Sequence, residues 1–90
     1  MRVAICDDEA EMRKLLAEKV RRHCLEAEIL LLQSGREVTA LYPAPQILLL
    51  DIGLPDMDGM EAARAFREKN KDTVLIFITA LEEYVFQAFD

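Results

Sequence analysis

The stretch QILLLD, residues 46–51, places an unbroken run of large apolar residues directly before an aspartate, Asp51. A short apolar run without alternation is typical of a strand buried on both faces, as in a parallel sheet covered by helices. A lone carboxylate is costly inside such a core, so we expect Asp51 at the exposed C-terminal tip of the strand. Open α/β sheets bind their ligands at that edge. We therefore expect the rest of the chain to hold Asp51 in place.

Strands and helices alternate on both sides of this stretch. The pattern of apolar residues predicts three more strands and three long helices: strands at 2–6, 28–33 and 73–79, and helices at 9–23, 58–69 and 81–90. A short helix begins after Ser34 and ends before Pro43, since proline bars its continuation. Strands that alternate with helices indicate βαβ units and a parallel sheet. Alternation alone does not fix the order of the strands in that sheet.

Polar residues mark the points at which helices begin. Ser34 and Glu37 form a capping box, in which the hydroxyl caps the helix and the carboxylate reaches back. Asp58 is a candidate cap for the helix that follows it, and Asp8 is a candidate cap for the helix at 9–23. For Asp8 this role is compatible with a second one in metal binding. We interpret Asp56 as a solvated loop residue.

The long helices are amphipathic. The predicted buried positions are Met12, Leu15, Leu16 and Val20 in the first helix, and Met60, Ala63 and Phe66 in the helix at 58–69. Charged residues, Arg13 among them, fill the other face of the first helix. Because residues of opposite charge can pair along that face, we interpret it as a solvated surface rather than a nucleic-acid patch.

Composition excludes several classes of function. The net charge of −6 and isoelectric point of about 4.7 argue against direct nucleic-acid binding, because no basic stripe is present. No apolar run reaches the roughly 18 residues of a membrane span, and none at the start reads as a signal peptide. Cys6 and Cys24 do not make a disulfide framework and are not spaced as metal ligands. We expect reduced thiols in a cytoplasmic protein.

Three of the predicted strands end in residues that can do chemistry. Asp7 and Asp8 follow the first strand, Asp51 closes the third and Thr79 closes the fourth. If the first and third strands are neighbours, three carboxylates meet at one edge of the sheet, where they repel one another or recruit a cation. Carboxylate oxygens suit Mg²⁺ or Mn²⁺, and a threonine hydroxyl beside them suits a phosphoryl oxygen.

Taken together, these motifs resemble the receiver domain of two-component response regulators. The matching motifs are Asp7-Asp8-Glu9, Leu49-Leu50-Asp51, Leu54-Pro55-Asp56-Met57-Asp58-Gly59 and Ile78-Thr79-Ala80. They involve all four predicted strands, in the order and at the separations found in the family. The start of the chain and residues 83–90 further resemble receivers that precede LytTR-type DNA-binding domains.

The resemblance implies a flavodoxin-like, doubly wound parallel sheet with the strand order 2-1-3-4. It also implies that Asp51 is a carboxylate nucleophile, which accepts a phosphoryl group from a phosphohistidine on a sensor histidine kinase. Thr79 would hydrogen-bond a phosphoryl oxygen, and the small side chain of Ala80 would leave room for it.

The resemblance implies a metal site at the same place. Asp8, Asp51 and the backbone carbonyl of Gly53 would bind Mg²⁺ (or Mn²⁺), and Asp7 would act mainly through bound water. The metal would offset charge on the phosphoryl group and orient it for in-line transfer. The strand order would place these groups at the topological switch between the first and third strands.

The sequence departs from the family at its C-terminal end. The fifth strand and fifth helix of receivers, with a lysine at the end of that strand, have no counterpart in residues 1–90. We therefore expect a single receiver domain, incomplete at its C-terminus, that binds metal, is phosphorylated weakly at most and transmits little signal. The fourth strand would be an exposed apolar edge, so we expect self-association, through strand pairing or by exchange of the helix at 81–90.

Two other functions fit parts of the pattern. A receiver-like interaction module that is never phosphorylated is compatible with the missing lysine. A metal-dependent phosphohydrolase with an aspartate nucleophile would need a D-x-D-x-T pattern after the first strand, where this chain reads DDEAE at residues 7–11. On the receiver interpretation the chain is not an enzyme, although it assists its own phosphorylation and dephosphorylation. DNA would be contacted only by an output domain absent from this chain.

Overall fold

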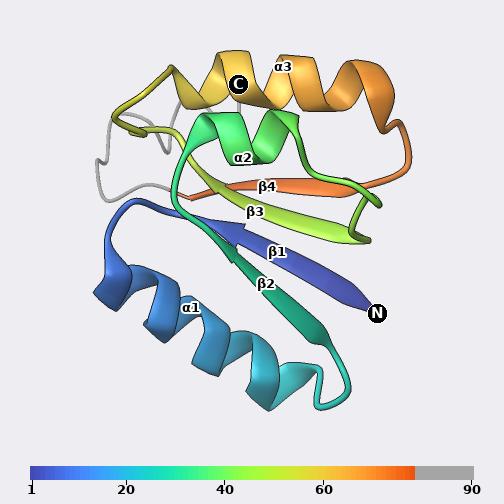
Figure 1. Ribbon diagram of the computed structural model, residues 1–90. Helices are drawn as coiled ribbons and strands as arrows, with labels where there is room; N and C mark the ends of the chain where they lie inside the picture. Colours follow the sequence, from blue (N-terminus) through green and yellow to red (C-terminus); the bar gives the residue numbers. More distant parts are fainter. Residues whose placement is uncertain (79–90) are drawn as a thin grey trace.

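The structure is a computed structural model and describes residues 1–78 of the chain. Its strands are β1 (Arg2–Cys6), β2 (Glu28–Leu32), β3 (Ile47–Asp51) and β4 (Val74–Ile78). Its helices are α1 (Ala10–His23), α2 (Gly35–Thr39) and α3 (Gly59–Lys69). Helix α1 covers one face of the sheet, and α2 and α3 cover the other (Figure 1). The predicted helix at 81–90 lies outside the described residues.

The sheet is parallel throughout, with the strand order β2-β1-β3-β4. This confirms the order that the family resemblance implied and that the alternation of elements left open. Strands β1 and β3 are therefore neighbours although α1, β2 and α2 separate them in the chain (Figure 1). Cys6 pairs with Leu50 in the register, so the next residues, Asp7 and Asp51, lie side by side at the C-terminal edge of the sheet.

The strands bury their side chains alternately toward the two helical layers. Leu50 of β3 packs with Phe66 of α3 in the larger cluster, between the sheet and the pair α2 and α3. Ile5 of β1 packs with Ala17 of α1 on the opposite face. Residues 47–50 are fully buried toward α3 and partly buried toward α1, which confirms that they form a strand covered on both faces.

Helix α1 is rotated relative to the predicted amphipathic stripe. The fully buried position is Ala17, flanked by the partly buried Leu16 and Val20, whereas Leu15 is 45% exposed. The prediction of Leu15 as a buried residue is therefore wrong. A small alanine at the centre of the contact lets the helix approach the sheet closely, and the stripe that it centres excludes position 15. Met60 of α3 is likewise more exposed than predicted, at 37%.

The predicted caps are confirmed for two of the three helices. The Ser34 hydroxyl accepts a hydrogen bond from the Glu37 amide at 3.3 Å, and the Asp58 carboxylate accepts one from the Met60 amide at 2.9 Å. The prediction of Asp8 as the cap of α1 is wrong. The N-cap position falls on Glu9, whose side chain makes no capping bond. The helix thus begins one residue later than predicted, and Asp8 remains free of a capping role.

The two cysteines are free thiols, as predicted. Cys6 is buried, and its thiol lies 3.4 Å from the Ser34 carbonyl oxygen, to which it donates. Burial, with smaller contributions from nearby carboxylates, raises the pKa of Cys6 to about 12, so it is an unreactive core residue. Within residues 1–78 no helix has both the length and the apolar character that crossing a bilayer requires.

Candidate metal centre

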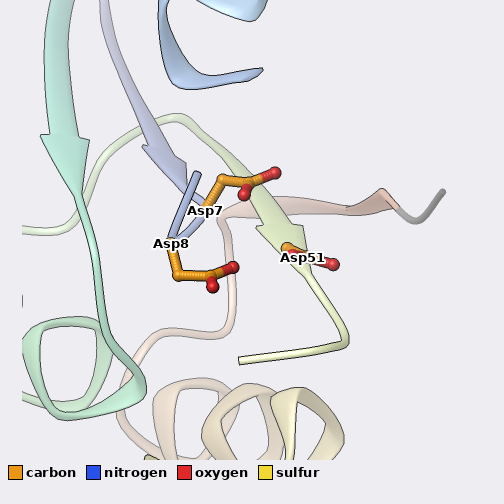
Figure 2. Close-up of side chains that lie close together, drawn as sticks. All are labelled: Asp7, Asp8 and Asp51. Atoms are coloured by element: carbon orange, nitrogen blue, oxygen red, sulfur yellow. The ribbon is translucent and has the colours of Figure 1, made fainter. Parts of the chain in front are cut away.

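Three carboxylates converge where β1 and β3 end. One oxygen from each of Asp7, Asp8 and Asp51 lies within 4.8 Å of the other two (Figure 2). Asp7 and Asp8 follow β1, and Asp51 is the last residue of β3. The cluster predicted from the sequence is therefore present in the fold, at the carboxyl edge of the sheet where α/β proteins bind ligands.

Asp7 is the most firmly held member of the cluster, and it is only 4% exposed. Its Oδ1 accepts a hydrogen bond from the Glu9 amide at 2.9 Å, and its own amide donates to the Leu32 carbonyl at 3.1 Å. The Arg13 guanidinium donates to the Asp7 carbonyl oxygen at 2.6 Å. Arg13, which we assigned to the solvated face of α1, thus fixes the β1–α1 loop. Asp8 is exposed beside it.

Asp51 is half-buried and accepts a hydrogen bond from the Gly53 amide at 3.1 Å. Burial raises the pKa of Asp51, and the negative charges of Asp7, Asp8 and Glu9 raise it further. The bond from Gly53 opposes this rise. The site therefore carries repulsion between like charges, which a cation would relieve.

The loop between β3 and α3 closes on itself next to Asp51. The Gly59 amide donates to the Ile52 carbonyl at 3.0 Å, and both Ile52 and Leu54 are buried. A Cβ atom at Gly59 would lie 2.6 Å from the Ile52 Cα, so a side chain at this position would force the loop open. Gly59 is thus required by a close approach of backbone to backbone.

Asp56, in the middle of this loop, is an exposed loop residue as predicted, but its carboxylate also has two partners that the sequence did not indicate. Its Oδ1 accepts a hydrogen bond from the Gly35 amide at 2.9 Å, and its Oδ2 accepts one from the Arg36 amide at 3.1 Å. The bond from Gly35 is the main cause that lowers the pKa of Asp56. The side chain is exposed at its surface but attached to the first turn of α2.

The donor set suits a hard divalent cation. All the converging atoms are carboxylate oxygens, and the backbone of Gly53 lies directly beside Asp51. Oxygen ligands with positions left for water suit Mg²⁺ or Mn²⁺. The Cys6 thiol donates away from the cluster, to a backbone carbonyl, and so does not belong to it. Thr79 and Ala80, the other predicted site residues, lie outside the described residues.

The fold and this cluster define a class of protein, and comparison with known sequences identifies the family. Residues 3–90 match the family described as the response regulator receiver domain. The chain therefore belongs to the response regulator receiver family, a signalling domain of two-component systems.

Individual relatives agree with this assignment. The sensory transduction protein LytT of Oceanobacillus iheyensis is 34% identical over 98% of this chain, which spans 37% of that protein. The response regulator TrrA of Thermotoga maritima, solved in complex with Mg²⁺ and BeF, is 32% identical with a TM-score of 0.82. That match covers 92% of this chain and 72% of TrrA. TrrA was also solved in complex with the histidine kinase ThkA, where the TM-score is 0.78 over the same shares of both chains, again at 32% identity.

The curated relatives are much longer than this chain. The chain spans between about a fifth and two fifths of the length of the first four that it matches. Similarity therefore covers the receiver portion of those proteins.

Proposed function

We propose that this receiver accepts a phosphoryl group on Asp51 from a phosphohistidine of a sensor histidine kinase. The observation that carries the proposal is the convergence of three carboxylates within 4.8 Å at the carboxyl edge of the sheet. A half-buried carboxylate with an elevated pKa, placed beside two others at the ligand-binding edge of the sheet, is typical of a functional site. The complex of TrrA with a histidine kinase supports the choice of phosphoryl donor.

In the proposed reaction, an Asp51 oxygen attacks the phosphorus atom of the phosphohistidine. The new P–O bond forms while the P–N bond breaks, and the electron pair of that bond returns to the imidazole ring. The Gly53 amide holds the Oδ1 atom of Asp51, which leaves the other carboxylate oxygen available for attack. We propose that Thr79 donates a hydrogen bond to a phosphoryl oxygen and that Ala80 leaves space beside it.

We further propose that Asp8, Asp51 and the Gly53 carbonyl hold Mg²⁺ or Mn²⁺ directly, with Asp7 acting through bound water. When bound, the cation supplies positive charge that offsets the charge of the transferring group. Asp7 suits the indirect role because its Oδ1 is already engaged by the Glu9 amide. The Mg²⁺ and BeF complex of TrrA supports this choice of cation.

Phosphorylation can be tested with a small phosphodonor. The 90-residue chain is incubated with acetyl phosphate and Mg²⁺, and intact mass spectrometry detects a phosphoryl adduct. The adduct is expected in the wild type and in Asp72→Asn, an exposed control far from the cluster, and is expected to be lost in Asp51→Asn. Multiple turnover without an adduct would favour the phosphohydrolase, and neither adduct nor turnover would favour an interaction module.

We also propose that the chain self-associates through β4. This strand pairs with β3 along one edge, and no strand within residues 1–78 pairs with its other edge. Val74 is 56% exposed and Ile76 is 46% exposed, so the strand offers both apolar surface and backbone groups to a second copy. Light scattering after size exclusion is expected to show a dimer that Ile76→Lys weakens. A monomer at high concentration in the wild type would refute this.

The subfamily, the location and the output domain are proposed from the resemblance to other receivers. We propose a LytTR-type regulator, in line with the similarity to LytT, and a cytoplasmic location. DNA would then be contacted by an output domain outside residues 1–90. Expression of a longer chain from the same gene would test the output domain directly.

A further inference from the structure

The carboxylate of Asp56 bridges two elements that are far apart in the chain. Its two oxygens accept hydrogen bonds from consecutive amides, those of Gly35 and Arg36, at 2.9 Å and 3.1 Å. The neighbouring Met57 packs at the same point: a Cβ atom at Gly35 would lie 2.3 Å from Met57 Cγ. The tip of the β3–α3 loop is thus attached to the start of α2 by a polar and an apolar contact together.

The same loop begins at the metal cluster. Gly53, whose backbone lies against Asp51, is separated from Asp56 by Leu54 and Pro55 only. Four contacts restrain the loop: the bond from the Gly59 amide to the Ile52 carbonyl at its base, the burial of Leu54, and, at its tip, the packing of Met57 on Gly35 and the bonds of the Asp56 carboxylate. The first two act close to the chain ends of the loop, whereas the last two attach its tip to α2.

We propose that Asp56 is a positioning residue for the metal site. By holding the loop tip on α2, it keeps the Gly53 backbone in the conformation in which the carbonyl can join Asp8 and Asp51 as a ligand. The inference rests on the proposed function, because it requires that the cluster binds a cation. Groups that orient metal ligands without touching the metal typically change affinity by about 10–100-fold when they are removed.

The coupling between Asp56 and the metal site acts in both directions. If the bonds from Asp56 to α2 favour metal binding by some factor, metal binding must strengthen those bonds by the same factor. The amides of Gly35 and Arg36 then report on the occupancy of a site with which they make no contact. Helix α2 becomes an element that responds to the metal site.

Metal affinity tests the proposal in the full 90-residue chain. Mg²⁺ binding is titrated by calorimetry in the wild type, Asp56→Asn and Asp56→Ala. Asp56→Ala removes both acceptors and is expected to raise the Kd about tenfold, the lower end of the range above, because the other three loop restraints remain. Asp56→Asn keeps one acceptor oxygen, so its Kd for Mg²⁺ is expected to lie between those of the wild type and Asp56→Ala.

Ser34→Ala is the matched control. It removes the bond from the Glu37 amide, a different restraint on the same turn of α2, and leaves the β3–α3 loop intact. It is expected to lower stability while it changes the Mg²⁺ affinity less than about twofold. Equal affinities in the wild type and Asp56→Ala, or an equal loss in Ser34→Ala, would overturn the proposal.

Hydrogen exchange distinguishes a positioning role for Asp56 from a purely structural one, because a structural role alone would not make amide exchange depend on Mg²⁺. Addition of Mg²⁺ to the wild type is expected to slow exchange of the Gly35 and Arg36 amides, and to have no such effect in Asp56→Ala. Exchange that is unchanged by saturating Mg²⁺ would count against the coupling. If the wild type binds no Mg²⁺ at all, the proposed function fails together with this inference, whereas normal binding with an inert Asp56 refutes this inference alone.

Discussion

The two ends of the sheet are built on opposite principles. At the amino end, polar groups are satisfied within the chain: the Thr73 hydroxyl donates to the Pro45 carbonyl at 2.7 Å, and the Val74 amide donates to the Gln46 carbonyl at 2.9 Å. One nitrogen of Arg67 donates to the carbonyls of the turn that follows α3, including that of Thr73 at 2.7 Å. Here charge and hydrogen bonding serve stability.

At the carboxyl end, within residues 1–78, no basic side chain forms an ion pair with the three clustered carboxylates. Asp7, Asp8 and Asp51 bring like charges together, and the pKa of Asp51 is raised as a result of burial and of this repulsion. The same fold could have placed neutral residues at these positions without loss of its core. The amino end thus holds the strands together, whereas the carboxyl end brings three carboxylates into mutual repulsion, where we propose that a cation binds. Substitutions at the amino end should therefore lower stability, whereas substitutions at the carboxyl end should mainly change metal binding.

The largest effect is expected at the amino end, from Arg67→Met. Methionine keeps the apolar stem but loses the charged donor to three carbonyls. The free energy of unfolding is expected to fall by about 3 kcal/mol, since bonds to a charged group are stronger than neutral ones and two part-buried carbonyls lose this donor. Urea denaturation measures the change. The Mg²⁺ affinity of Arg67→Met should stay within about twofold of that of the wild type. A large loss of affinity would contradict the separation of stability at the amino end from metal binding at the carboxyl end.

The next effect is expected at the carboxyl end, from the cation itself. Mg²⁺ at about a hundred times its Kd should stabilise the fold by about 2.7 kcal/mol, because the proposed site is assembled only in the folded chain. Asp8→Asn should abolish most of this gain, whereas Asp72→Asn, an exposed aspartate at the amino end, should keep it. Thermal unfolding with Mg²⁺ and with EDTA measures the gain. If Mg²⁺ stabilised Asp8→Asn as much as the wild type, the stabilisation could not come from a cation bound at the carboxylate cluster.

Thr73→Val is expected to have a smaller effect at the amino end. The residue is 5% exposed, and valine has nearly its shape but cannot donate to the Pro45 carbonyl. The buried carbonyl is left without this donor, which should cost about 1–2 kcal/mol. Thr39→Val is the control, because its hydroxyl donates to the Arg36 carbonyl at an exposed position and its loss should be nearly neutral. If the two variants lost similar free energies of unfolding, burial of the Thr73 hydrogen bond would not explain its contribution to stability.

Much of this organisation could be predicted from the sequence, because the signals are local. The unbroken apolar run before Asp51 marked a covered strand, and Ser34 and Asp58 marked helix starts through bonds to amides two or three residues away. Strand order came from the resemblance to receivers, and with it the convergence of Asp7 with Asp51. Apolar periodicity alone does not specify which strands become neighbours.

The sequence missed or misplaced features where the deciding contact is remote or the pattern is ambiguous. Asp56 has no local signal for its role, since its partners, Gly35 and Arg36, lie about twenty residues earlier. Leu15 and Leu16 are adjacent, so either could belong to the buried stripe of α1, and only the packing of Ala17 on the sheet decides. The start of α1 was displaced by one residue, an ordinary uncertainty for a helix end.

The smallest effect is expected from Asp51→Asn without metal, and its sign is opposite to that of the changes at the amino end. Asparagine keeps an oxygen for the Gly53 amide but removes a charge that Asp7 and Asp8 repel. The variant should be more stable than the wild type in EDTA at neutral pH, by less than about 1 kcal/mol, because solvent screens this half-exposed site. Urea denaturation of both proteins, run in parallel, measures the difference.

The pH dependence identifies the cause of that gain. The pKa of Asp51 in the folded chain is raised above its ordinary value of 3.8, so ionisation costs stability in the wild type as pH rises from that value through the folded pKa. Below 3.8 the group is protonated in both states, and the advantage of Asp51→Asn should vanish. Above the folded pKa it should be complete and constant. An advantage that persists at low pH would mean that packing, rather than charge, separates the two proteins.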